Sequence, residues 1–134
     1  MKVKTDTKEK FTVITPVEPH LYDNMAADLA ATCNKCLETS PKNVILNLES
    51  VTAVDDACAM SIAQLQETFY EKSVSFVICE VKPMLEDIFE KLEILDVLNI
   101  TPTESEAWDI VQMEEIEREL MDGEDVEFDV EDDK

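Results

Sequence analysis

The stretch Asn43–Phe69 constrains the fold of this chain more than any other. It begins with the apolar run Val44–Leu48, whose β-branched residues are typical of a strand buried on both faces of a parallel sheet. Its second half carries apolar residues at intervals of four, three and four, which indicates one buried face of a helix. Between them lies a loop that ends in Asp55 and Asp56, both good N-cap residues. Binding sites often lie where an acidic loop meets a helix N-terminus in this way.

The formal net charge of −21 argues against nucleic acid or an anionic membrane surface as a partner. About half of the excess lies in residues 114–134, which hold 12 acids and 2 bases, a net of −10. We expect residues 1–120 to form one domain and residues 121–134 to be an acidic, disordered tail. No signal sequence and no apolar run of about 18 residues is present, so we expect a cytoplasmic protein without membrane insertion.

Glycine and histidine each occur once, at Gly123 and His20. A Walker loop, a dinucleotide fingerprint and a nucleophile elbow all need glycine for close backbone approach or positive φ, so the body of the chain contains none of them. A single histidine excludes a His-rich metal site, and no candidate nucleophile lies near it in the sequence. We therefore expect no enzymatic activity, no cofactor and no metal, and we interpret His20 as an exposed or half-packed loop residue.

The four cysteines are Cys33, Cys36, Cys58 and Cys79. Cys33 and Cys36 have CxxC spacing, but they fall inside a helical pattern, and no second pair completes a zinc site. The favoured interpretation is that all four are small buried residues or inert surface thiols. A redox pair at Cys33 and Cys36 is the alternative.

The hydrophobic periodicity predicts the order β-β-α-β-α-β-α-β-α. The predicted strands are residues 1–5, 11–14, 44–48, 74–79 and 97–100, and the predicted helices are residues 24–39, 58–71, 83–92 and 104–120. Strands that alternate with helices imply a mostly parallel sheet, and the first two strands add an antiparallel hairpin at its edge. The fold class is therefore α/β, with four helices.

Caps and core residues complete this prediction. Asp23 or Asn24 can cap the first long helix, and Thr103 with Glu106 forms a capping box before the last one. Trp108 lies one position from the apolar stripe of that last helix, so packing is favoured over an exposed anchor. The methionines in helical stripes are predicted to fill the core, and they are Met25, Met60, Met84 and Met113.

This order and its central residues resemble the STAS domain, the fold of bacterial anti-sigma factor antagonists and of the cytoplasmic part of sulfate transporters. The strongest part is Val44–Glu49 followed by Val54 and Asp55, and the resemblance covers about residues 2–120. Family members carry there an apolar strand, an acid and a hydrophobic-Asp pair. The receiver domain of response regulators is a weaker alternative, because its acids and its Lys-Pro pair follow other strands.

The resemblance implies a non-enzymatic protein-binding module in bacterial transcription regulation, whose partner could be an anti-sigma kinase. The implied docking residues are Asp55, Asp56, Ala57, Cys58 and Ser61. Ala57 falls where antagonists carry the phosphorylated serine, and Cys58 falls on the following glycine, so the phospho-acceptor is absent. Asp55 and Asp56 could serve as helix caps alone or also bind the partner. The alternative function is that of a structural STAS subunit in a transport or stress-signalling assembly.

Overall fold

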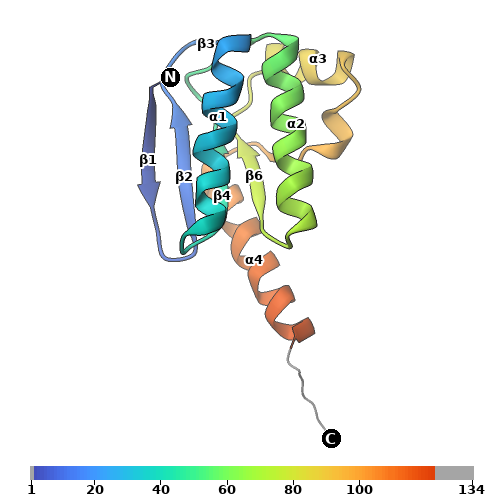
Figure 1. Cartoon of the computed structure of the whole chain (residues 1–134). Helices are drawn as coiled ribbons and strands as arrows, with labels where there is room; N and C mark the ends of the chain where they lie inside the picture. Colours follow the sequence, from blue (N-terminus) through green and yellow to red (C-terminus); the bar gives the residue numbers. More distant parts are fainter. Residues whose placement is uncertain (1, 123–134) are drawn as a thin grey trace, which may run out of the picture.

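The computed structural model describes residues 2–122 and contains a five-stranded sheet in the order β1-β2-β4-β6-β7 (Figure 1). The first strand pairs antiparallel with the second, and the other neighbours are parallel. The strands are β1 (Val3–Thr7), β2 (Phe11–Pro16), β4 (Asn43–Asn47), β6 (Phe76–Cys79) and β7 (Ile100–Thr101). A separate parallel pair joins β3 (His20–Leu21) and β5 (Ala53–Val54). The predicted hairpin edge and parallel sheet are confirmed.

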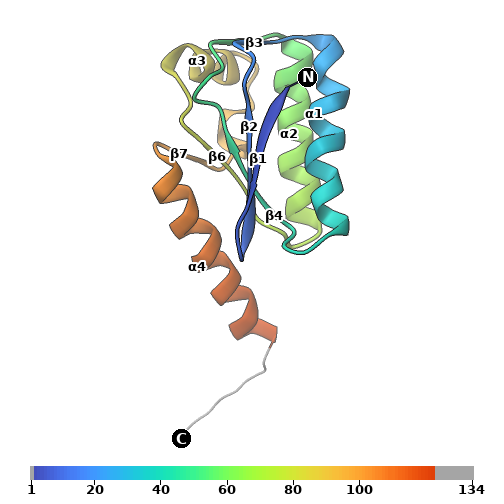
Figure 2. The same cartoon turned by 90° about the vertical axis from the view of Figure 1, so that its left-hand side faces the viewer.

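Helices cover both faces of this sheet (Figure 2). Their bounds are α1 (Asp23–Lys35), α2 (Asp56–Glu71), α3 (Pro83–Lys91) and α4 (Glu104–Asp122), with short 3-10 turns η1 (Cys36–Glu38) and η2 (Leu95–Val97). The first two helices lie side by side on one face, α4 crosses the other face, and α3 lies near the carboxyl ends of the parallel strands. Four helices therefore follow the predicted order.

Residues of β4 alternate between two hydrophobic cores. Val44 and Leu46 belong to the larger core under α1, α2 and α3, whereas Ile45 belongs to the smaller core under α4. All three side chains are buried. The neighbouring strand β6 divides its residues in the same way. Burial on both faces explains why these strands are continuous apolar runs without polar alternation.

The predicted bounds of the final strand, residues 97–100, were wrong. Val97 belongs to η2, where Val97 N–H donates to the Ile94 carbonyl at 3.1 Å, and the strand β7 starts only at Ile100. Ile100 and Thr101 then pair with Ile78 and Cys79. Leu95 and Leu98 of the run before β7 pack against the larger core from a turn, whereas Val97 is exposed. The hydrophobicity of this run therefore does not reflect strand pairing.

Two helices begin as predicted and one does not. Thr103 Oγ1 accepts from Glu106 N–H at 3.2 Å, which confirms Thr103 as the cap of α4, and Pro83 opens α3. The N-cap of α1 is Tyr22, which makes no side-chain cap bond, instead of the predicted Asp23 or Asn24. The N-cap of α1 therefore lies one or two residues before the predicted one.

Two helices end in the same hydrogen-bonded motif without glycine. After α2, Ser73 N–H donates to the Tyr70 carbonyl and Val74 N–H donates to the Phe69 carbonyl, at 3.0 and 2.9 Å. Glu93 occupies the position after α3 that Ser73 occupies after α2, and both have positive φ, at 63° and 58°. These are Schellman motifs, in which glycine is the usual residue.

The predicted methionine core is largely wrong. Met60, Met84 and Met113 are exposed, and only Met25 packs against the larger core. Leu120, near the end of α4, is exposed as well. The buried face of α4 is built from Ala107 and Val111, and these small residues let the helix lie close to the sheet.

Trp108 packs as predicted, with its ring 5.3 Å from that of Phe11. Its indole N–H donates to the Glu104 carboxylate at 3.0 Å. The predicted acidic tail lies outside the described residues except for Met121 and Asp122, which end α4. Within residues 2–122, the helices are too short or too polar to cross a membrane.

Candidate functional site

The short β3–β5 pair positions the acidic loop in front of α2. The Pro19 carbonyl accepts hydrogen bonds from the backbone N–H groups of Thr52 and Ala53, at 2.7 and 3.2 Å. Asp55 N–H donates to the Leu21 carbonyl at 3.0 Å. The loop before α1 and the loop before α2 are thereby joined at one end of the molecule. Each strand has only two residues, too few to produce a periodic signal in the sequence, so this pair was not predicted.

Asp55 is the N-cap of α2. It has extended backbone angles, and its carboxylate accepts from Cys58 N–H at 2.9 Å. The next two residues, Asp56 and Ala57, form the first turn of the helix, and both are exposed. The free N–H groups and the dipole of a helix N-terminus favour the negative charge of both aspartates. The predicted capping role is confirmed for Asp55, whereas Asp56 lies inside the helix.

The other two predicted docking residues face inward. Cys58 is fully buried, and its thiol donates to the Tyr22 carbonyl. Ser61 is half-buried, and its hydroxyl donates to the Ala26 carbonyl of α1 at 3.5 Å. Both side chains thus fasten α2 to α1 and its preceding loop. Of the five predicted residues, Asp56 and Ala57 are exposed and Asp55 is half-exposed.

Two exposed aromatic rings lie beside this helix start. The rings of His20 and Tyr22 are 5.7 Å apart, and half of the Tyr22 side chain is accessible. Tyr22 is also the residue whose carbonyl accepts from the thiol of Cys58. We define the α2 N-terminal surface as Tyr22, Asp55, Asp56 and Ala57. No periodicity marks Tyr22 as a surface residue, and only the β3–β5 pairing brings it next to α2.

A second group of acids surrounds the carboxyl ends of β4 and β6. Asn47 donates to the Glu104 carboxylate at 2.8 Å, and the Glu80 carboxylate accepts from the backbone N–H of Glu104 at 3.1 Å. Burial, followed by the charges of Glu104, Glu80 and Glu49, raises the pKa of the Cys79 thiol to about 12. The described residues contain no cluster of three or more His, Cys, Asp or Glu that could hold a metal ion. The bond between Asn47 and Glu104 joins α4 to β4.

The CxxC cysteines do not have the properties of a redox pair. Both thiols are free, Cys33 is buried and Cys36 is half-buried. Burial raises the pKa of the Cys36 thiol, and it raises that of the Cys33 thiol further. Redox-active cysteines require the opposite shift, because the thiolate is the reactive form. The structural interpretation is therefore favoured.

Comparison with known proteins identifies the family. The family model described as "STAS domain" matches residues 2–107. Similar solved structures include a candidate anti-sigma factor antagonist from Thermotoga maritima, with 15% identity, a TM-score of 0.74 and coverage of 82% of this chain and 94% of that one. The comparison with curated proteins found no match to this sequence.

Two further structures have similar scores. An anti-sigma factor antagonist (STAS) domain protein from Planctomyces limnophilus has 19% identity and a TM-score of 0.70, and the match covers 82% of this chain and 97% of that one. A sulfate transporter family protein from Wolinella succinogenes has 14% identity and a TM-score of 0.70, with coverage of 83% and 92%. At these identities the structures show the common fold, whereas the family model spans most of the sequence. This chain belongs to the STAS family.

Proposed function

We propose that this protein is a non-enzymatic binding module in bacterial regulation, whose protein partner docks on the α2 N-terminal surface. The observation that carries the proposal is the position of Ala57, an exposed alanine in the first turn of α2, beside the capping carboxylate of Asp55. Antagonists of the STAS family carry their phosphorylated serine at the matching position. The partner is therefore of the kind that antagonists bind, an anti-sigma kinase, and its binding here is not switched by phosphorylation.

Two features of α2 support a docking surface that is not switched by phosphorylation. A phosphate at a helix N-terminus is stabilised by free N–H groups and the dipole, and it adds nearly two negative charges to a docking surface. Ala57 has no hydroxyl to accept it. The hydroxyl of Ser61 is one turn further along and is directed to the Ala26 carbonyl between two helices, so a kinase has poor access to it. Asp56 supplies one permanent charge instead.

The residue types present support binding without catalysis. The single histidine, His20, is exposed, and its ring centre lies 5.7 Å from that of Tyr22. The thiols of Cys33 and Cys79 are buried and have raised pKa values. None of these groups has the paired acid and base that covalent catalysis requires. The exposed carboxylates and aromatic ring are suited to contact with another protein.

The first experiment tests the missing phospho-acceptor. Wild-type protein and the Ala57→Ser variant are incubated with an anti-sigma kinase and ATP, and intact masses are measured. We expect no phosphate on the wild type, at Ser61 or elsewhere in α2. A phosphorylated wild type would overturn the proposal. Phosphate on Ala57→Ser would support it directly, although Cys58, in place of the family's glycine, could also block the kinase.

The second experiment tests the docking surface. Asp56→Arg reverses an exposed charge in the first turn of α2, and Asp87→Arg makes the same change at an exposed position of α3. Binding of each variant to an anti-sigma kinase is measured by calorimetry. We expect Asp56→Arg to weaken binding by roughly tenfold or more, and Asp87→Arg to leave it unchanged. Equal effects of both variants would exclude the α2 N-terminal surface.

A structural subunit of a transport or stress-signalling assembly is the second candidate. The observation that favours it is the similarity to the sulfate transporter family protein, with a TM-score equal to that of one antagonist. Purification of tagged protein from its native cell separates the two. Membrane components in the complex would select the structural role, and a kinase would select the regulatory one.

A further inference from the structure

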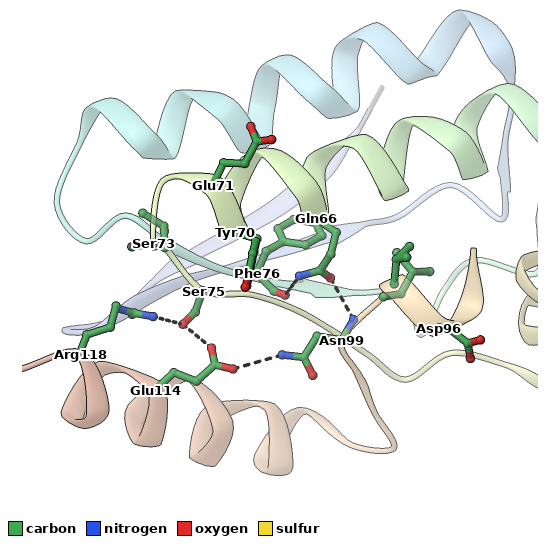
Figure 3. Close-up of a pocket in the computed structure, with 13 residues that line it drawn as sticks. Gln66, Tyr70, Glu71, Ser73, Ser75, Phe76, Asp96, Asn99, Glu114 and Arg118 are labelled. Atoms are coloured by element: carbon green, nitrogen blue, oxygen red, sulfur yellow. Dashed lines mark hydrogen bonds between the residues drawn. The ribbon is translucent and has the colours of Figure 1, made fainter. Parts of the chain in front are cut away.

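Two adjoining pockets lie along α2, the larger of them at the opposite end of the helix from the α2 N-terminal surface. The larger, of about 750 Å³, is enclosed by the second half of α2, the start of β6, η2 and α4 (Figure 3). The smaller, of about 370 Å³, continues along the outer side of α2. Gln66, Tyr70 and Val97 line both pockets. We call the combined depression the α2–η2 groove.

The polar groups at the floor of the α2–η2 groove are bonded to one another. Gln66 donates to the Phe76 carbonyl at 3.0 Å and accepts from Asn99 N–H at 3.0 Å, so it bridges the gap between β6 and the segment before β7. Ser75 donates to the Glu114 carboxylate at 2.6 Å, and the amide of Asn99 donates to the same carboxylate at 3.4 Å. A small polar ligand would have to break these bonds, so the groove is better suited to a partner that brings apolar side chains.

The walls of the groove expose three large apolar side chains. The exposed fractions are 81% for Tyr70, 59% for Val97 and 50% for Met60. Met60 and Tyr70 lie on one face of α2 together with Ala63 and Glu67, because these positions recur at helical spacing. Ten residues of helix span about 15 Å, so this wall matches an apolar helix face of about three turns.

The rim of the groove is acidic. Besides Glu114 on the floor, the acids among the described residues that line the groove are Glu67, Glu71 and Asp96, and the only base is Arg118. The guanidinium of Arg118 is already used, since it donates to Ser75 Oγ at 3.2 Å and to Asn43 Oδ1 at 3.3 Å and lies 3.7 Å from Glu115. A second copy of this chain would bring another net charge of −21 to the same rim, and the resulting repulsion disfavours it.

We infer that the α2–η2 groove binds a basic amphipathic helix of a protein partner. The apolar face of that helix covers Tyr70, Val97 and Met60, and its lysines or arginines pair with the acids of the rim. Tyr70 is the anchor, because an exposed tyrosine offers a large contact area at low entropic cost. Met60, at the near end of the groove, lies one helical turn from Asp56, whereas the anchor Tyr70 lies at the other end of α2. The inference does not depend on the function proposed for the α2 N-terminal surface.

The test uses a peptide of about 14 residues of leucine and lysine, patterned as an amphipathic helix, and a scrambled peptide of the same composition. Methyl-labelled methionines give one NMR signal per region, with Met60 in the groove, Met84 on α3, and Met113 on the outer side of α4. We expect the amphipathic peptide to shift the Met60 signal to saturation while the Met84 and Met113 signals stay unchanged. The scrambled peptide should bind at least roughly tenfold more weakly.

The Tyr70→Ser variant should raise the dissociation constant of the amphipathic peptide by roughly tenfold or more. Leu120→Ser, at an exposed leucine of α4 that does not line the groove, is the matched control and should bind as the wild type does. Both side chains are exposed, so thermal midpoints should be unchanged. Equal binding of the scrambled peptide, shifts confined to Met84 or Met113, or unaltered affinity of Tyr70→Ser would overturn the inference. If the wild type formed a dimer and Tyr70→Ser were monomeric, the groove would bind a second copy of this chain, and the inference would be overturned.

Discussion

The carboxylate of Asp55 accepts a hydrogen bond of 2.9 Å from the backbone N–H of Cys58, three residues later. This bond satisfies one of the N–H groups that a helix start leaves without a partner in the helix. The two residues also belong to different environments, since Cys58 is fully buried and Asp55 is at the edge of the exposed surface. The cap at the start of α2 therefore links a residue at the surface, Asp55, to a residue in the core, Cys58.

Asp55→Ala should lower the free energy of unfolding by about 1 kcal/mol, the usual value of an N-cap. Asp55→Asn retains an acceptor oxygen and should cost less. Asp56→Ala is the control, because Asp56 is exposed and is not the cap, so it should cost under about 0.5 kcal/mol. Urea denaturation of the three variants measures these differences. If Asp56→Ala cost more than Asp55→Ala, the cap would be misassigned.

Glycine at the two Schellman positions should stabilise the protein. Ser73 and Glu93 have positive φ, a conformation that costs a residue with a side chain roughly 1–2 kcal/mol. Glycine has no such cost but gains entropy in the unfolded chain, so Ser73→Gly and Glu93→Gly should each add about 0.5–1 kcal/mol. Glu67→Gly, in the middle of α2, should instead cost about 1 kcal/mol. Thermal denaturation of the three variants compares them, and destabilisation by all three would contradict the motif.

The central strand should tolerate truncation poorly. Leu46 is fully buried in the larger core, so Leu46→Ala should cost about 2–5 kcal/mol through lost burial and a residual cavity. Lys42 is exposed just before the same strand, and Lys42→Ala should cost under about 0.5 kcal/mol. Chemical denaturation of both variants provides the comparison. Similar costs at the two positions would be inconsistent with burial of β4 on both faces.

Stability should fall at alkaline pH because of the Cys79 thiol. Burial, together with Glu104, Glu80 and Glu49, raises the pKa of this thiol from 9.0 to about 12. Between these values the unfolded chain has lost the proton and the native protein retains it, so stability falls as pH rises. Below about pH 9 both states are protonated, and the contribution is constant.

Urea midpoints measured from about pH 8 to about pH 11 test this dependence. Cys79→Ala removes the group, so its midpoint should fall less steeply with pH than that of the wild type, whatever its absolute stability. Cys33 remains in the variant, and its thiol also has a raised pKa, so part of the slope should persist. Parallel curves for the two proteins would show that Cys79 titrates alike in both states.

Hydrophobic pattern was sufficient to predict the larger elements. Continuous apolar runs marked β4 and β6, because each buries alternate residues in two different cores. The stripe from Cys58 to Phe69 marked α2, and all its apolar members are buried. The hydrophobic pattern gave wrong predictions where an apolar residue lies outside a strand or on the exposed face of a helix. Val97 is apolar but lies in η2, and Met60 follows the helical period of α2 but faces solvent.

The chemistry of the first turn of α2 was determined by the sequence alone, because the absence of a hydroxyl at Ala57 and the capping capacity of Asp55 are properties of the residues themselves. Tertiary structure alone decided what surrounds them. The two-residue pairing of β3 with β5 places Tyr22 beside α2, and the crossing of α4 under the sheet adds Glu114 and Arg118 to the lining of the α2–η2 groove. Such contacts join segments far apart in the chain, and local periodicity contains no information about which distant surfaces meet.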